Sequence, residues 1–212
     1  MEDSKTNILI ISSNQNKIDE IQNIINAYDD TINVEHCDIN IPKMQMTVDV
    51  VSAYKCNYAI RYIMEDKNLY DTYKDYNILT EETSLHVNAL NGMPGPYINW
   101  FIDSMGVDGV YKMISFYQDK TAKAISAVSL STNISSIKNK TSIKKEIFTT
   151  CGETQGIIVK PYISDNDFVY SYSWDCMFQL DNYSIPYSQM DKLEKNKYSH
   201  RAMAMKNIIK LL

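Results

Sequence analysis

The feature that most limits how this chain can fold is an alternation of short apolar runs with stretches of helical spacing. Every residue from Ile8 to Ile11 is apolar, which is typical of a short buried strand. In the stretch from Asn16 to Ala27, isoleucines recur every three or four residues, as on one face of a helix. Val34 to Cys37 and Val50 to Ile63 repeat this order of strand and helix. We therefore expect an α/β fold.

The rest of the chain predicts further elements and one irregular connection. Between Glu65 and Asn77 the sequence is polar, rich in tyrosine and without a clear period, so we expect an extended surface connection. The segment ISSIKNK separates two β-rich runs and predicts a hairpin with a basic tip, which is either a solvated turn or a functional basic patch. The other expected elements are strands at Asn77–Leu79 and Leu85–Val87, helical stretches at Ile98–Met105 and Val107–Phe116, β-rich runs at Lys123–Thr132 and Ser142–Thr150, and a helix at His200–Leu212.

Composition narrows the classes of partner. With 212 residues and 44% hydrophobic content the chain can bury one sizeable core, so residues 1–212 are expected to form a single domain. The formal net charge is -5, whereas proteins that bind nucleic acid or anionic membranes usually present a basic face. We therefore expect no nucleic-acid or membrane partner. A phosphate-bearing ligand needs only a local cluster of cations and backbone N–H groups.

The cysteines and the N-terminal segment indicate a compartment. Cys37, Cys56, Cys151 and Cys176 are scattered and include no C-x-x-C pair, which argues against a zinc knuckle or a redox motif. We expect buried free thiols in a reducing compartment. The apolar run in MEDSKTNILIISS is too short for a secretory or membrane segment. These features predict a soluble cytoplasmic protein.

The first stretch that can carry chemistry is Ser12-Ser13-Asn14-Gln15-Asn16-Lys17, between an expected strand and an expected helix. Backbone N–H groups at the helix N-terminus and the side chain of Lys17 would converge there, an arrangement that favours an anion. The glycines of a Walker loop are missing. An ordinary cap, with Asn14 or Ser13 as the N-cap residue, would explain the same residues.

The second stretch is the pair of adjacent glutamates, Glu81 and Glu82. If the strand points one carboxylate into a cleft, a divalent cation or a basic group is needed to hold that carboxylate ionised. Magnesium would also attract the phosphates that the first stretch suggests. Alternatively, one glutamate faces solvent and the other caps a turn.

The third stretch is Ser173-Trp174-Asp175, which follows Tyr170 and Tyr172. An aromatic side chain beside an acid can stack on a planar base while the acid accepts a hydrogen bond from a ring N–H. The same aromatic residues would also suit a hydrophobic core.

The fourth stretch runs from Lys195 to Arg201. Ser199 is expected to be a helix N-cap, which places His200 and Arg201 in a first helical turn, where the helix dipole disfavours cations. Such an unfavourable local arrangement is more frequent at functional sites than elsewhere, although exposure to solvent would make its free-energy cost small.

In this order the four stretches resemble the inosine triphosphate pyrophosphatase family, whose members hydrolyse non-standard purine nucleoside triphosphates. The most specific parts are N-A-L-x-G-x-P-G-P-Y-I-x-W-F at Asn88–Phe101, the W-D pair, and E-K-N-x-x-S-H-R at Glu194–Arg201. The resemblance covers nearly the whole chain and implies a long twisted mixed β-sheet flanked by helices, with two lobes and a nucleotide cleft between them. It also implies a homodimer and a Mg²⁺ cofactor, for which Mn²⁺ could substitute.

The resemblance implies a role for each stretch as well. Glu82 and Lys17 would be catalytic, and Glu82 and Glu81 would hold the metal. The loop and Lys55 would contact the triphosphate, and His200 and Arg201 would recognise the 6-oxo group of the base. The residues expected to bind the substrate are Ser12, Ser13, Asn14, Gln15, Asn16, Lys17, Lys55, Thr83, Tyr172, Ser173, Trp174, Asp175, Lys195, His200 and Arg201.

The chain also departs from the family's pattern. Ser13 replaces a glycine of the first loop, and Glu82 stands where the family has a catalytic aspartate. Lys43 falls where the family has a metal-binding glutamate, and Asn99 replaces a lysine. These changes bear on activity and leave the expected fold unaffected.

The reaction implied by the resemblance is attack of a magnesium-activated water on the α–β phosphate linkage of ITP, dITP or XTP, which gives the monophosphate and pyrophosphate. Two alternatives stay open. The septum-associated pyrophosphatases have a related fold but lack the W-D and S-H-R stretches. A nucleotide-binding protein that has lost catalysis and acts as a sensor or partner module would agree with Lys43 and Asn99.

Overall fold

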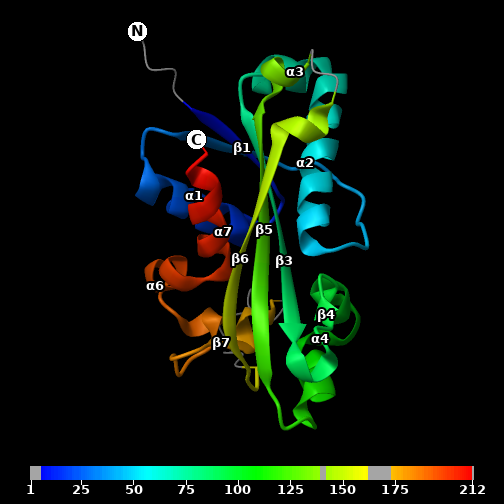
Figure 1. The fold of residues 1–212 in the computed structure, drawn as a ribbon, viewed down its shortest axis with the longest axis vertical. Coiled ribbons are helices and arrows are strands. Elements are labelled where there is room, and N and C mark those ends of the chain that lie inside the picture. Colours follow the sequence, from blue (N-terminus) through cyan, green and yellow to red (C-terminus); the bar gives the residue numbers. More distant parts are fainter. Residues whose placement is uncertain (1–5, 139–141, 162–172, 212) are drawn as a thin grey trace. The chain divides into compact units, whose positions relative to one another are not determined.

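The computed structural model describes residues 6–138, 142–161 and 173–211. The chain divides into two compact units: unit 1 is Met1–Glu82, Ala127–Gly152 and Arg201–Leu212, and unit 2 is Thr83–Ser126 and Glu153–His200. The strands form one sheet in the order β2-β1-β3-β5-β6-β7, and β4 also pairs with β3 (Figure 1). Strands β3, β5 and β6 each contribute residues to both units.

Unit 1 is built on parallel strands joined by helices. β1 pairs in parallel with β2 and with β3, in a register that sets Ile8 opposite Val34 and Leu9 opposite Ile78. Parallel strands need crossover connections. α1 connects β1 to its neighbour β2, and α2 with α3 connects β2 to β3, which lies on the other side of β1. The elements are β1 (Asn7–Ile11), α1 (Gln15–Tyr28), β2 (Asn33–Cys37), α2 (Val48–Glu65), α3 (Lys67–Tyr73), β3 (Asn77–Val87), β5 (Thr121–Asn133), α5 (Ile134–Ile137), β6 (Ile147–Ile158) and α7 (His200–Ile209).

The core of unit 1 has two layers, one on each face of β1. Ile8 and Ile10 belong to a cluster with buried residues of α1 and α7, whereas Leu9 and Ile11 belong to a cluster with buried residues of α2. Successive side chains of a strand point to opposite faces, so every position of such a strand is apolar when helices cover both faces. This explains the uninterrupted run that the sequence shows at Ile8–Ile11.

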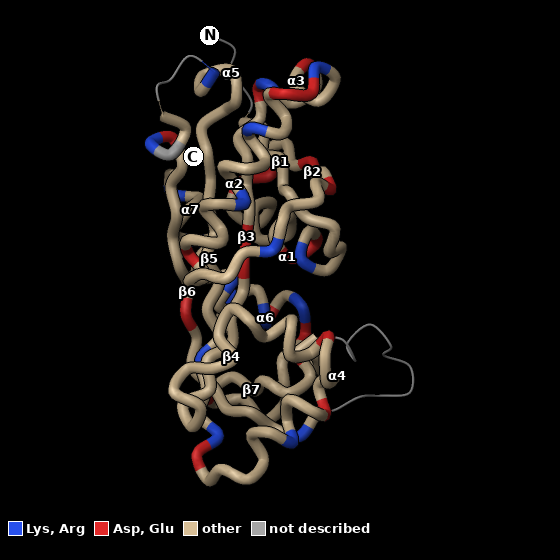
Figure 2. Tube along the Cα trace, turned by 90° about the vertical axis from the view of Figure 1, so that its right-hand side faces the viewer, with Lys and Arg blue, Asp and Glu red and all other residues tan. Residues whose placement is uncertain are grey.

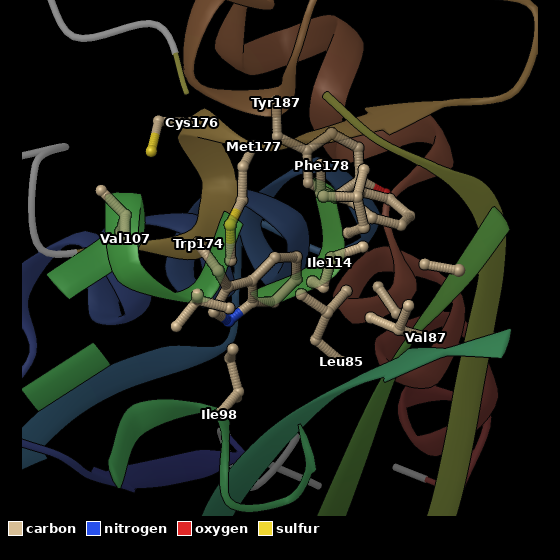
Figure 3. Close-up of a cluster of buried hydrophobic side chains, with 14 of the residues drawn as sticks. Leu85, Val87, Ile98, Val107, Ile114, Trp174, Cys176, Met177, Phe178 and Tyr187 are labelled. Atoms are coloured by element: carbon tan, nitrogen blue, oxygen red, sulfur yellow. The ribbon is translucent and has the colours of Figure 1, made fainter. Parts of the chain in front are cut away.

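Unit 2 is built on antiparallel pairs around one core. β4 (Pro94–Gly95) is antiparallel to β3, and β7 (Phe178–Leu180) is antiparallel to β6. Its helices are α4 (Ile98–Ser115) and α6 (Lys192–Tyr198). Figure 3 shows Leu85 and Val87 of β3, Ile98 and Ile114 of α4, and Phe178 gathered in the buried cluster. With the parallel pairs of unit 1, these pairs make the sheet mixed, as expected.

Two local predictions are wrong. The stretch expected to be an extended connection between Glu65 and Asn77 contains α3, which Asp66 caps by accepting hydrogen bonds from the backbone N–H groups of Asn68 and Leu69. None of the residues of this helix is fully buried, so the sequence lacks the apolar period that would reveal it. The strands predicted at Asn77–Leu79 and Leu85–Val87 are one strand, β3, because the polar residues between them continue the strand, and all but Glu82 are buried.

The segment around ISSIKNK also differs from the expected hairpin. Asn133 caps the short helix α5, and Ile143–Glu146 forms a 3-10 turn, so β6 begins at Ile147 and not at Ser142. Residues 139–141 of the tip lie outside the described residues.

The predicted break in α4 is confirmed at Gly106, whose φ of 69° and ψ of 170° are not helical.

The cysteines follow the expectation in part. All four are free thiols; Cys56 and Cys176 are buried, Cys37 is half-buried, and Cys151 is exposed, which the sequence analysis did not expect. Burial raises the pKa of Cys56 to about 12 and that of Cys176 to about 11. Because the thiolate is the reactive form, both thiols should be inert in the folded protein.

We expect a water-soluble disulfide reagent to modify Cys151 first when the native protein is treated at mildly alkaline pH. Cys56 and Cys176 should react only after denaturant is added. Peptide mass spectrometry at successive times measures the order, and Cys151→Ser, which should lose the earliest adduct, is the control. Early modification of Cys56 in the native protein would contradict the packing of α2.

Candidate active site

The loop after β1 forms the N-terminal cap of α1. The side-chain oxygen of Asn14 accepts a hydrogen bond from the backbone N–H of Lys17 at 3.2 Å, which confirms the predicted cap. Ser12 Oγ accepts from the backbone N–H of Asn14 at 3.1 Å. The helix dipole makes this end of α1 favourable for an anion. The exposed members of the loop are Ser13, Asn14, Gln15 and Asn16.

Two lysines from different helices meet at Glu81. Lys17 Nζ of α1 lies 2.7 Å from Glu81 Oε2 and 3.4 Å from the backbone oxygen of the same residue. Lys55 Nζ of α2 lies 3.0 Å from that backbone oxygen and 3.1 Å from Glu82 Oε2. The structure thus brings together the two lysines that the sequence assigned to the triphosphate.

Arg201 completes the surroundings of Glu81. Its Nε donates to Glu81 Oε1 at 3.2 Å, and its Nη1 pairs with the carboxylate of Glu20 on α1. The side chain of Glu81 has a relative exposure of 0%, so its charge is compensated within the protein. We call this set the Glu81 network; its members are Glu20, Arg201, Glu81, Lys17, Lys55 and Glu82.

The network explains how two adjacent carboxylates are accommodated on one strand. Glu81 and Glu82 are successive residues of β3, whose side chains alternate between faces, and they have different partners. Three acidic and three basic side chains compensate one another, so the structure does not need a divalent ion to relieve like-charge repulsion. Figure 2 shows acidic positions along β3 with basic positions beside them. Glu82 keeps a side-chain exposure of 19%, and Thr83, the next residue, is buried.

A second group of predicted residues lies in unit 2. Lys195 Nζ of α6 is 2.6 Å from Asp175 Oδ2 and lies 5.2 Å from the ring centroid of Tyr187. Ser173 caps the 3-10 turn Trp174–Cys176 by accepting from the backbone N–H of Asp175 at 3.3 Å. A buried lysine paired with an acid beside an aromatic ring could bind the polar edge of a planar ligand.

His200 is held between aromatic rings. Its ring stacks on Tyr187 at 5.9 Å with an interplanar angle of 12°, and it lies 5.2 Å from Trp174. Trp174 is 5% exposed and also packs edge-on against Phe178, within the cluster drawn in Figure 3. This burial agrees with the alternative of a core residue, and the stacking of Trp174 on a base stays a prediction.

Tyr187 belongs to this group although the sequence analysis missed it. Its hydroxyl oxygen lies 3.0 Å from Thr154 Oγ1, and burial raises the pKa of Tyr187 to about 12, which keeps the phenol neutral. Its contacts with Lys195 and His200 form only when the chain folds, so the tyrosine-rich sequence around Tyr187 does not predict them. Tyr170 and Tyr172, in contrast, lie outside the described residues.

Two of the residues that depart from the family's pattern are at the surface. Lys43 is exposed before α2, and Asn99 is exposed on α4.

Over the described part of the chain, no group of three His, Cys, Asp or Glu side chains is placed to hold a metal ion. None of the described helices has the length and apolar content needed to cross a bilayer.

The network predicts unequal effects of two similar substitutions on stability. Glu81→Gln keeps the shape of the side chain but leaves Lys17 and Arg201 without their shared counter-charge, so the free energy of unfolding should fall by about 2–4 kcal/mol. Glu82→Gln is the matched control, and its partly exposed pair with Lys55 should contribute less than about 1 kcal/mol. Urea denaturation followed by circular dichroism measures both, and equal losses would contradict the assignment.

Several known proteins are similar to this chain over most of its length. The Ham1 family model matches residues 8–211. The inosine triphosphate pyrophosphatase of Neurospora crassa is 33% identical over 195 residues, which cover 92% of this chain and 86% of the relative. The inosine triphosphate pyrophosphatase of Pyricularia oryzae is 33% identical over 198 residues, with coverage of 93% and 89%.

Two solved structures share the fold at lower sequence identity. The Staphylococcus aureus Ham1 protein has a TM-score of 0.69 and 18% identity, covering 97% of each chain. A HAM1 protein from Coxiella burnetii has a TM-score of 0.70 and 17% identity, covering 97% of this chain and 98% of the other. From the matched family model and the fungal relatives, it follows that this chain belongs to the Ham1 family.

Proposed function

We propose that this protein hydrolyses non-canonical purine nucleoside triphosphates, such as ITP, dITP and XTP, to the nucleoside monophosphate and pyrophosphate. Family membership and the name shared by the fungal relatives support this activity. The observation that carries the proposal is the meeting of Lys17 and Lys55 on the backbone oxygen of Glu81, beside the carboxylate of Glu82. The two lysine side chains can pair with the negative charges of a triphosphate, and the partly exposed carboxylate of Glu82 lies beside them.

Lys17 and Lys55 would bind the triphosphate and stabilise the negative charge that develops on its oxygens. Asn14 already fixes the first turn of α1 through its cap, so the backbone N–H groups of the loop need little rearrangement to contact phosphate. Water adds its oxygen to the α-phosphorus, and the bond between this phosphorus and the oxygen that bridges to the β-phosphorus breaks. Pyrophosphate leaves with the electron pair of that bond, and the attacking water loses a proton to the solvent.

The divalent ion expected for the family fits Glu82 better than Glu81. Both carboxylate oxygens of Glu81 are paired with cations, whereas Glu82 is partly exposed and paired with one lysine. Magnesium commonly uses one or two carboxylates together with substrate phosphates, so a three-residue cluster is not required. When bound, the ion would supply Lewis acidity at the phosphates. The role of Glu82 is to hold it, and that of Lys55 is to exchange its carboxylate partner for phosphate.

Recognition of the base is assigned to polar residues of unit 2 and, in unit 1, to Arg201. Lys195 and Asp175 provide an adjacent donor and acceptor, and the stacking on Tyr187 fixes the ring of His200. Arg201 donates hydrogen bonds and does not accept them, so it suits the 6-oxo group of hypoxanthine or xanthine better than the 6-amino group of adenine.

Family resemblance also leads us to propose a homodimer and a cytoplasmic location. Light scattering coupled to size-exclusion chromatography tests the dimer: twice the mass of one chain supports it, and the mass of a single chain contradicts it.

We expect the protein to release IMP and pyrophosphate from ITP in the presence of Mg²⁺, with Mn²⁺ as an effective substitute. Glu82→Gln removes the proposed metal-binding charge and should lower kcat/KM by at least about a hundredfold, because metal binding and charge stabilisation are lost together. Chromatography of the nucleotide products and a coupled pyrophosphate assay measure this effect.

The matched control is Glu153→Gln, which neutralises an exposed glutamate that pairs with Lys123. It should leave turnover unchanged. Release of IDP with orthophosphate would overturn the proposed bond cleavage, and tight binding of ITP without any turnover would favour the alternative of a nucleotide-binding protein. Wild-type rates in Glu82→Gln would move the catalytic carboxylate elsewhere.

A further inference from the structure

Two reciprocal hydrogen bonds fasten α2 to β3 directly before the Glu81 network. Ser52 Oγ of α2 donates to the backbone oxygen of Thr80 at 3.3 Å, and Thr80 Oγ1 donates to the backbone oxygen of Ser52 at 2.8 Å. Both residues have a relative exposure of 0%. Helix and strand are therefore joined twice at one point, away from water.

Further hydroxyl groups support this junction. Ser129 Oγ of β5 donates to Ser52 Oγ at 2.9 Å, and Thr149 Oγ1 of β6 lies 2.8 Å from Ser129 Oγ. Each hydroxyl carries a single hydrogen. Because the hydrogen of Ser129 is used on Ser52, Thr149 must be the donor to Ser129. The chain of hydrogen bonds has one direction, from Thr149 through Ser129 and Ser52 to the backbone of β3.

The junction is adjacent to residues of the proposed reaction. Lys55 follows Ser52 by about one turn of α2, so both side chains lie on neighbouring parts of the same helix face. Glu81 and Glu82 directly follow Thr80 on β3. The register of β3 with β1 extends to Leu79, and the next two backbone oxygens of β3 accept hydrogen bonds from Ser52 and Lys55 instead.

Hydrogen-bonded hydroxyl groups fix the position of α2 along β3 more specifically than apolar side chains would. Burial of apolar surface is not directional, so it allows a helix to slide along a strand by fractions of a turn. A buried hydroxyl group is unfavourable unless it is hydrogen-bonded, and a fully bonded network specifies one arrangement. The network fixes the place of Ser52 along β3, and with it the place of Lys55.

We propose that Ser52 and Thr80 are positioning residues, which set Lys55 against the backbone oxygen of Glu81 and the carboxylate of Glu82. Their effect on catalysis rests on the proposed function, whereas their effect on the position of Lys55 does not. Without the junction, the amino group of Lys55 is held less closely and spends more time in water.

The first test compares two chemically identical substitutions. Ser52→Ala removes two hydrogen bonds at the junction, the one from Ser52 Oγ to the backbone oxygen of Thr80 and the one from Ser129 Oγ to Ser52 Oγ. Ser131→Ala removes another buried serine hydroxyl, whose oxygen accepts from the backbone N–H of Ile78 on β3 at 3.0 Å. The readout is the rate at which acetic anhydride modifies Lys55 relative to Lys123, measured by peptide mass spectrometry. The ratio should rise about threefold in Ser52→Ala, as expected for a less tightly held amine, and stay unchanged in Ser131→Ala. The same ratio in both variants would overturn the proposal.

The second test is steady-state hydrolysis of ITP by the same variants. Ser52→Ala should lower kcat about tenfold with KM changed less than about twofold, because Lys17 and the loop still bind the ground state. Ser131→Ala should keep both constants. A change in Lys55 modification without a change in kcat would overturn the role in catalysis. If the wild type fails to hydrolyse ITP while the modification ratio still responds, the proposed function fails and the positioning of Lys55 stands.

Thr80→Val provides a milder variant in case Ser52→Ala does not fold. It keeps the shape of the side chain and removes one hydrogen bond, the one from Thr80 Oγ1 to the backbone oxygen of Ser52, whereas Ser52→Ala removes two, so the same changes should appear with smaller size. Unaltered kcat and unaltered Lys55 modification in a folded Thr80→Val protein would also overturn the proposal.

Discussion

The arrangement of the site depends on how the buried charge of Glu81 is compensated. An ionised carboxylate is very unfavourable away from water unless cations pair with it. Lys17 comes from the first helix and Arg201 from the last, so the ends of the described chain must both be in place before this charge can be buried. Formation of the site is therefore coupled to the folding of unit 1, and its cations are ordered before any substrate arrives.

The same compensation separates the roles of two neighbouring glutamates. Glu81 has both oxygens engaged and no exposed side-chain surface, as a structural anchor requires. Glu82 has one lysine partner and remains partly exposed, as its proposed exchange of partners during the reaction would require. The longer side chain of Glu82, compared with the family's aspartate, reaches Lys55 directly. The pairing holds the amino group of Lys55 beside Glu82, where the proposed function requires a contact with phosphate.

Local signals in the sequence predicted much of the fold. The apolar run of β1, the cap at Asn14 and the break at Gly106 each depend on a few adjacent residues, and each prediction is confirmed. The continuity of β3 could not be predicted, because the polar residues between its apolar ends are stabilised by partners such as Ser52, distant in sequence. α3 was missed because it buries no residue fully.

The site shows the same limit. The motifs selected Lys17, Lys55 and Arg201 but did not show that all three meet at Glu81 and its neighbour, since contacts over such sequence separations arise only on folding. Likewise, no local feature of Tyr187 indicates that its ring stacks on His200.

A double-mutant cycle of Lys17→Met and Glu81→Gln tests the central claim most directly, with unfolding free energies measured in urea. The account predicts a coupling energy of about 1–3 kcal/mol between Lys17 and Glu81, whereas additivity within about 0.5 kcal/mol would contradict the ion pair on which the site depends.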